Sequence, residues 1–193
     1  MTLPHVPLEG SLVRLEPLQE HHIPGLCAIG LDAELWRWTV TEVRTEADMR
    51  RYVEEAFAAA AAGSALPFAT VHRASGRVVG STRLAAIDLT NRRVEIGWTW
   101  LGREFQRTGM NTEAKYLMLA FAFETLGCNR VELKTDALNQ KSRAAIRRIG
   151  AIEEGILRSH MISHGDRRRD TVYYSILREE WPSVREWFLE RCP

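Results

Sequence analysis

The stretch that decides the fold is "EFQRTGMNTEAKYLMLAF", residues 104–121. It follows an apolar run, "VEIGWTWL" (94–101), and opens into a helical segment. A helix N-terminus carries unpaired backbone N–H groups and a positive dipole end, so it attracts anions. Gly109 lets the backbone approach a ligand closely or adopt a positive φ. The sequence therefore predicts either a plain connector or a phosphate-binding nest at residues 106–111.

The segments on either side of this loop have the periodicities of strands and helices. Strands are expected at 11–18, 66–73, 77–87, 92–101, 130–136, 156–163 and 171–177. Helices are expected at 45–63, 112–127, 139–150 and 178–192, with weaker helical character at 20–38. Thr45 and Asp48 match a capping box. The three strands before the loop are joined by short turns, which predicts an antiparallel meander.

Length and composition indicate one globular α/β domain. The chain has 193 residues, 45% of them hydrophobic, and no linker or repeat. We therefore expect a single domain over 1–193, with a C-terminal helix in 178–193 as its tail. The apolar, Trp-rich tail can pack on a partner, as in a homodimer, or on its own sheet.

The charge and the cysteines exclude several classes. Lys and Arg number 26 and Asp and Glu number 25, which argues against a nucleic-acid-binding protein. The three cysteines are far apart, so neither a disulfide framework nor a zinc site is expected. No signal peptide or membrane-spanning run is evident. The expectation is a cytoplasmic protein that binds no membrane.

Four motifs, in this order and spacing, resemble the GNAT superfamily of N-acetyltransferases. They are "EIGW" (95–98), "RTGMNTEA" (107–114), "NQKS" (139–142) and "RRIGA" (147–151). The branch they resemble includes the ribosomal-protein N-terminal acetyltransferases. The resemblance implies a mixed, largely antiparallel sheet of about seven strands flanked by helices and splayed between its fourth and fifth strands.

The resemblance also implies a binding site for acetyl-coenzyme A (acetyl-CoA). The pyrophosphate would lie on the loop and first helical turn, formed by Gln106, Arg107, Thr108, Gly109, Met110, Asn111 and Thr112. The pantetheine arm would meet the backbone of Thr99, Trp100 and Leu101, together with Asn139 and Ser142. Asn111 departs from the Gly or Ala of the family pattern, and its side chain could cap the helix instead. Asn139 fits a helix N-cap equally well.

Glu95 is the candidate general base. Strict alternation would place it on one strand face with Gly97, Thr99 and Leu101. The alternative is a structural carboxylate paired with Arg83 or Arg93.

The general acid is less clear from the sequence. Ile146 stands where many family members have a tyrosine acid. Ser142 is the nearest hydroxyl and would orient water or stabilise the thiolate, and Tyr174 is a fallback.

Several other groups carry weaker expectations. Arg143, Arg147 and Arg148 form a basic helix face that is either solvated or near the 3′-phosphate of the coenzyme. The aromatic residues Trp36, Trp38 and Phe68 belong to the core or to the acceptor cleft. His21 and His22 have no carboxylate or cysteine at ligand spacing, so no metal is proposed.

The predicted function is transfer of an acetyl group from acetyl-CoA to a primary amine. The acceptor is a protein N-terminus or a small molecule. Alternatives are a longer acyl donor and a non-catalytic acyl-CoA-binding module. An RNA- or ribosome-binding protein is disfavoured by the near-neutral charge.

Overall fold

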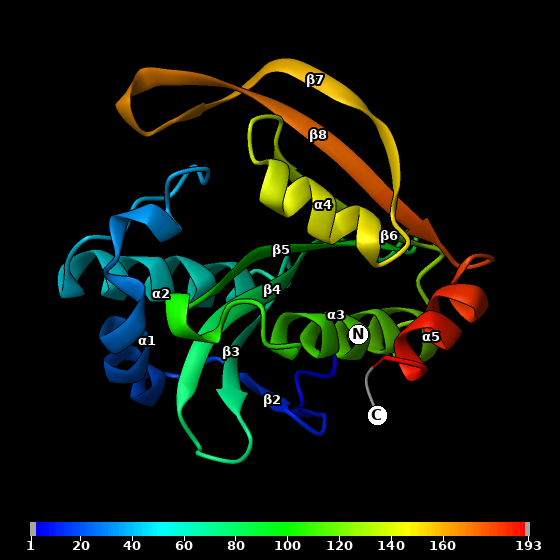
Figure 1. Ribbon diagram of the computed structural model, residues 1–193, viewed down its shortest axis with the longest axis horizontal. Helices are drawn as coiled ribbons and strands as arrows, with labels where there is room; N and C mark the ends of the chain where they lie inside the picture. Colours follow the sequence, from blue (N-terminus) through cyan, green and yellow to red (C-terminus); the bar gives the residue numbers. More distant parts are fainter. Residues whose placement is uncertain (1–2, 192–193) are drawn as a thin grey trace.

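The computed structural model describes residues 3–191, and its centre is one eight-stranded sheet (Figure 1). The strands are β1 (Leu8–Glu9), β2 (Val13–Pro17), β3 (Leu66–His72), β4 (Val78–Asp88), β5 (Arg93–Leu101), β6 (Arg130–Asp136), β7 (Ile152–Ser163) and β8 (Arg167–Leu177). Their order in the sheet is β1-β2-β3-β4-β5-β6-β8-β7. All neighbours pair antiparallel except β5 and β6. The predicted meander and fold class are confirmed, and the strand beyond the expected seven is the two-residue β1.

Helices cover both faces of the sheet. They are α1 (Ile23–Gly30), α2 (Glu46–Ala61), α3 (Met110–Ala120), α4 (Gln140–Arg148) and α5 (Trp181–Leu189), and α3 continues into a π-helical turn, Phe121–Thr125. The helices α1 and α2 close one hydrophobic cluster against the sheet, and α3 and α5 contribute to a second. The predicted capping box is present, because Thr45 and Asp48 exchange side-chain-to-backbone hydrogen bonds.

The predicted splay is confirmed by the pairing of β5 with β6. Their register has only three pairs, ending at Glu95 opposite Glu132. Both strands continue past that point without pairing, so the sheet opens into a wedge. On its other edge β5 stays paired with β4 as far as Leu101. The backbone of residues 96–101 therefore has no strand partner on the β6 side.

A bulge in β5 overturns the predicted facing of its side chains. Trp98 has φ +50°, and the register with β4 shifts between Ser81 and Arg83. The extra residue reverses the alternation. Thr99 consequently leaves the face of Glu95 and bonds the Thr82 hydroxyl instead. Simple period-2 reasoning was wrong beyond residue 97.

The C-terminal helix packs on this chain's own core. The indole of Trp181 stacks on the ring of Tyr116 in α3 at 6.2 Å and on Phe123 at 5.4 Å, and Phe188 is fully buried. The helix is shorter than the predicted 178–192, and residues 192 and 193 lie outside the described part of the chain. No helix in residues 3–191 is long and apolar enough to cross a membrane.

Candidate active site

The loop before α3 has the backbone geometry of an anion nest. Arg107 and Gly109 both adopt left-handed conformations, with φ of +65° and +74°. Gly109 is the N-cap residue and provides no capping side chain. The backbone N–H groups of residues 107–109, Asn111 and Thr112 donate to no acceptor within residues 3–191. Five unpaired donors at a helix N-terminus are suited to a phosphate.

Asn111 does not cap the helix. The helix begins at Met110, two residues before the predicted start, so Asn111 lies inside its first turn. Met110 points into the core, and the hydroxyl of Thr108 donates to the carbonyl of Phe105 at 2.6 Å. The expectation of an Asn cap was wrong because the positive φ of Gly109 already starts the helix.

Gln106 joins three parts of the site. Its Nε2 donates to the carbonyl of Leu101 at 3.0 Å, at the end of β5, and its Oε1 accepts from Lys141 in α4. At the start of α4, Asn139 Oδ1 accepts from the backbone N–H of Ser142 at 3.0 Å. The predicted N-cap is confirmed. The hydroxyl of Ser142 makes no hydrogen bond to any residue from 3 to 191, so it remains available.

A groove of about 550 Å³ extends from the loop across α3. It is lined by Ser11, Leu12, Gly109, Thr112, Arg148, Trp187 and Arg191. In the basic face of α4, Arg143 and Arg147 both bind Glu153 of β7. Arg148 forms no ion pair within the described chain. Of the three arginines it is therefore the one with a free guanidinium beside the nest.

Glu95 lies at the point where the sheet splays. It is 3% exposed, and its carboxylate forms an ion pair with Lys134 Nζ of β6 at 2.8 Å. Neither Arg83 nor Arg93 is its partner, so the predicted pairing was wrong. A Cβ on Gly97 would lie 2.7 Å from Glu95 Oε1, which explains the glycine in "EIGW". Whether Glu95 acts as a base stays a proposal.

Lys115 is a buried site residue that sequence reasoning missed. It is 7% exposed, and its Nζ donates to the hydroxyl of Thr99 at 2.5 Å. Burial lowers the pKa of Lys115 to about 7, opposed by the nearby charge of Glu95. The signal was available, because Lys115 shares the buried helical stripe of Met118 and Leu119.

The expected aromatic cluster divides between core and cleft. Trp36 and Phe68 are buried to 2% and 0%, so both belong to the core. Trp38 is only half-buried and lies under the guanidinium of Arg167 in β8, 5.6 Å from ring to Cζ. Trp98, which no motif suggested, is 40% exposed at the bulge. The two exposed indoles therefore mark the side of the wedge beneath α1 and α2.

The alternative proton donors are occupied elsewhere. Ile146 is buried in the core at the position of the family's tyrosine. Tyr174 is fully buried, and its hydroxyl accepts from Arg143 Nε at 3.2 Å. This leaves Ser142 as the hydroxyl of the predicted set with no bonded partner.

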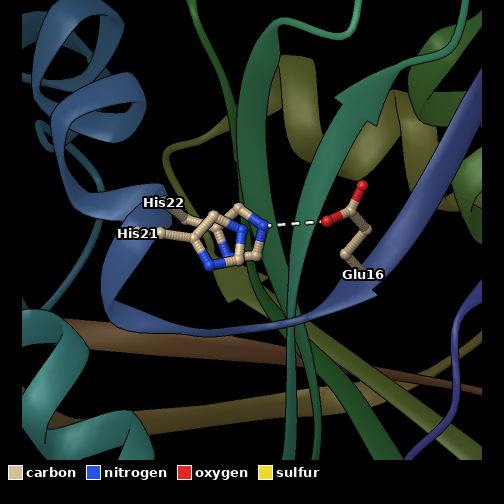
Figure 2. A group of neighbouring side chains, drawn as sticks. All are labelled: Glu16, His21 and His22. Carbon is tan, nitrogen blue, oxygen red and sulfur yellow. Dashed lines mark hydrogen bonds and ion pairs between the residues drawn. The ribbon is translucent and has the colours of Figure 1, made fainter.

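Glu16, His21 and His22 lie together at the end of β2, away from the wedge (Figure 2). The expectation of no neighbouring carboxylate was therefore wrong. His22 Nδ1 accepts from the backbone N–H of Gln19 at 3.0 Å, which places the proton of the neutral ring on Nε2, 3.0 Å from Glu16. Glu16 also binds Arg14. A ring that donates through Nε2 offers no lone pair there, so the group suits a structural hydrogen-bond network.

This site, an anion nest beside a splayed sheet, defines an acyl-CoA-dependent N-acetyltransferase of the GNAT type. The family model for the acetyltransferase (GNAT) domain matches residues 13–152, so the chain belongs to that family.

Three relatives illustrate the likeness. The chain is 41% identical over 106 residues to "Putative ribosomal N-acetyltransferase YdaF" of Bacillus subtilis (strain 168), covering 55% of this chain and 57% of that protein. It is 28% identical over 160 residues to "Uncharacterized N-acetyltransferase p20" of Bacillus licheniformis, covering 81% and 87%. The crystal structure of a GCN5-related N-acetyltransferase from Brucella melitensis superimposes with a TM-score of 0.91 at 32% identity, covering 100% of this chain and 88% of that one.

Proposed function

We propose that this protein transfers the acetyl group of acetyl-CoA directly to a primary amine in a ternary complex. The observation that carries the proposal is the nest of unpaired N–H groups around Gly109, adjoining a wedge that holds a buried carboxylate, Glu95. The nest would bind the pyrophosphate and Arg148 the 3′-phosphate. The unpaired backbone of Thr99, Trp100 and Leu101 would hydrogen-bond the pantetheine arm.

The start of α4 supplies the remaining contacts with the coenzyme. Asn139 and Ser142 face the proposed pantetheine path, since Lys141 between them is bonded to Gln106 of the loop. Arg107 and Thr108 would add contacts to the phosphates. The helix dipole of α3 adds a favourable term for any anion at its N-terminus.

The reaction forms one C–N bond and breaks one C–S bond. A neutral amine attacks the thioester carbon, and the oxyanion that develops needs backbone donors. Collapse of the adduct expels the coenzyme thiolate, the ammonium nitrogen loses one proton, and the sulfur gains one. Glu95, through a water molecule, is the proposed acceptor of the amine's proton, and Ser142 is the proposed hydrogen-bond donor to the sulfur.

The acceptor is proposed to be a protein N-terminal α-amine or a small-molecule amine. An α-amine has an ordinary pKa of about 7.7–8.0, so a modest base suffices, whereas a lysine side chain near 10.4 costs roughly 3–4 kcal/mol more to deprotonate. The relative's name mentions ribosomal acetylation, which supports the N-terminal choice. A longer acyl donor and a non-catalytic acyl-CoA-binding role are the alternatives.

Thiol release with a panel of amines tests this proposal. The wild type is expected to release coenzyme thiol only when an amine is present. Glu95→Gln should keep acetyl-CoA binding and lose about 10²-fold or more in turnover if Glu95 is the base. Glu132→Gln is the matched control, because Glu132 is the register partner of Glu95 and is bound to Arg130. An unchanged kcat/KM across pH for Glu95→Gln would remove the base assignment.

A further inference from the structure

We propose that the acceptor side of the wedge contains an anion-binding subsite centred on Arg169, so that the preferred acceptors carry a carboxylate or phosphate besides the amine. This inference rests on the proposed function, because it names the acceptor class of the same site. The experiment below separates failure of one from failure of the other.

Arg169 is a buried cation without a bonded partner. Its side chain projects from β8 and is 6% exposed. The guanidinium forms no hydrogen bond or ion pair with residues 3–191, and its Nε is buried without an acceptor. Burial lowers its pKa, and the carboxylates of Asp136 and Glu95 oppose this only from beyond contact. Buried charges in proteins are normally paired, so an external anion would supply what the fold does not.

A second unpartnered polar group lies beside it. Thr171 is two residues along β8 and therefore on the same face of the strand. Its hydroxyl is fully buried and has no hydrogen-bond partner among the described residues. A guanidinium and a hydroxyl can both donate, which suits the several acceptor oxygens of a carboxylate or phosphate.

The surrounding charges leave a cationic excess. Lys134 is paired with Glu95, and Arg167 with Asp136. These two ion pairs use both carboxylates and leave Arg169 uncompensated.

Arg83 is a further unpaired cation in the same region. It is 4% exposed and has no carboxylate partner within the described chain. It donates to the carbonyl of Tyr52 and stacks on the rings of Tyr52 and Trp98, and its Nε lacks an acceptor. Trp98 also lies within 6.0 Å of Lys134 Nζ, so both unpaired guanidinium groups adjoin the same exposed indole and the same ion pairs.

The subsite lies on the face opposite the bound coenzyme's proposed path. Lys134 pairs with Tyr173 and Asp136 with Thr171, so these side chains share one face with Arg169. The adjacent Tyr174 points the other way, under α4. Figure 1 shows the β7–β8 hairpin reaching toward the segment that follows α1, where Arg167 meets Trp38. The anion bound here would therefore belong to the acceptor and not to acetyl-CoA.

The test compares Arg169→Gln with Arg168→Gln. Arg168 is the next residue in the strand, is exposed and has no ion pair within residues 3–191, so it controls for loss of one positive charge. Thermal unfolding is followed with increasing inorganic phosphate at saturating acetyl-CoA, which keeps the nest occupied. Phosphate is expected to raise the Tm of the wild type and of Arg168→Gln clearly more than that of Arg169→Gln. Arg169→Lys should retain part of the response, and equal responses in the Gln variants overturn the subsite.

Matched amines then identify the source of the anion. One pair is 2-aminoethyl phosphate and ethanolamine, and the other is the peptide amides Asp-Ala-Ala and Asn-Ala-Ala. The wild type should prefer the anionic member of at least one pair by tenfold or more in kcat/KM, and Arg169→Gln should bring that ratio close to one. Preference in the first pair indicates a small metabolite, and in the second an acidic N-terminus.

The phosphate arm needs no turnover. If the wild type acetylates no amine while Arg169→Gln alone loses the phosphate response, the subsite stands and the proposed transfer fails. If amines are acetylated and neither pair shows a preference that depends on Arg169, the subsite fails and the proposed transfer stands.

Discussion

Replacing Lys115 with methionine should stabilise the protein at neutral pH and do so in a pH-dependent manner. Lys115 has a folded-state pKa of about 7 against an ordinary value of 10.5. As pH falls through this window the unfolded chain takes up a proton that the folded chain refuses. The stability of the wild type therefore decreases from about pH 10.5 to about pH 7 and is constant below. A difference of 3.5 pKa units corresponds to about 5 kcal/mol.

The methionine variant escapes that cost but loses the hydrogen bond to Thr99, which contributes about 1 kcal/mol. Its free energy of unfolding at pH 7 should thus exceed that of the wild type by up to about 4 kcal/mol. The gain should disappear near pH 10.5. Urea denaturation at intervals from pH 6 to pH 10.5 measures both curves.

Lys141→Met is the matched control. Lys141 is exposed on α4, so its removal should shift stability by little and equally at every pH. The reasoning would be refuted if Lys115→Met were less stable than the wild type at pH 7, or if the gap between the two proteins did not change with pH. Either result would mean that Lys115 is charged in the folded state.

Three further substitutions test how the nest is built. Glu113→Gln should cost about 3 kcal/mol in urea denaturation, because the buried carboxylate accepts from three backbone N–H groups and a serine hydroxyl of the β1–β2 turn. Gly109→Ala should cost about 1 kcal/mol and weaken acetyl-CoA binding in calorimetry. Gly127→Ala, at a similar φ of +68° with open space around it, should show the stability cost without the binding loss. Arg148→Gln should weaken binding of acetyl-CoA about tenfold but not binding of its 3′-dephospho form. Arg147→Gln, whose guanidinium already binds a glutamate of β7, should affect neither.

The elements with strong periodicity were predictable from the sequence. The meander, the helix capped by Thr45 and the nest before α3 follow from local rules of turn chemistry, capping and glycine geometry. The strand β1 was missed because a two-residue segment has no period. The facing of Thr99 and Trp100 was missed because a bulge obeys the pairing of two strands and leaves no mark in the pattern of one.

The long-range contacts of the site could not be obtained in this way. Glu95 meets Lys134 because β5 and β6 are parallel neighbours, a fact of topology and not of spacing. The unpaired state of Arg169 is likewise a property of the whole fold, since it depends on which carboxylates other strands bring near. Lys115 was the exception, because its place in an apolar helical stripe already signalled burial.

Thermal unfolding with and without 1 mM acetyl-CoA, with adenosine diphosphate as the control, tests the central claim most directly. For a dissociation constant of about 10 μM the ligand should stabilise the folded state by roughly 2.7 kcal/mol. In a domain of this size that raises the Tm by several degrees. A rise specific to the coenzyme is the predicted result. No rise at saturating acetyl-CoA would contradict the account, because the loop around Gly109 would then be only a connector.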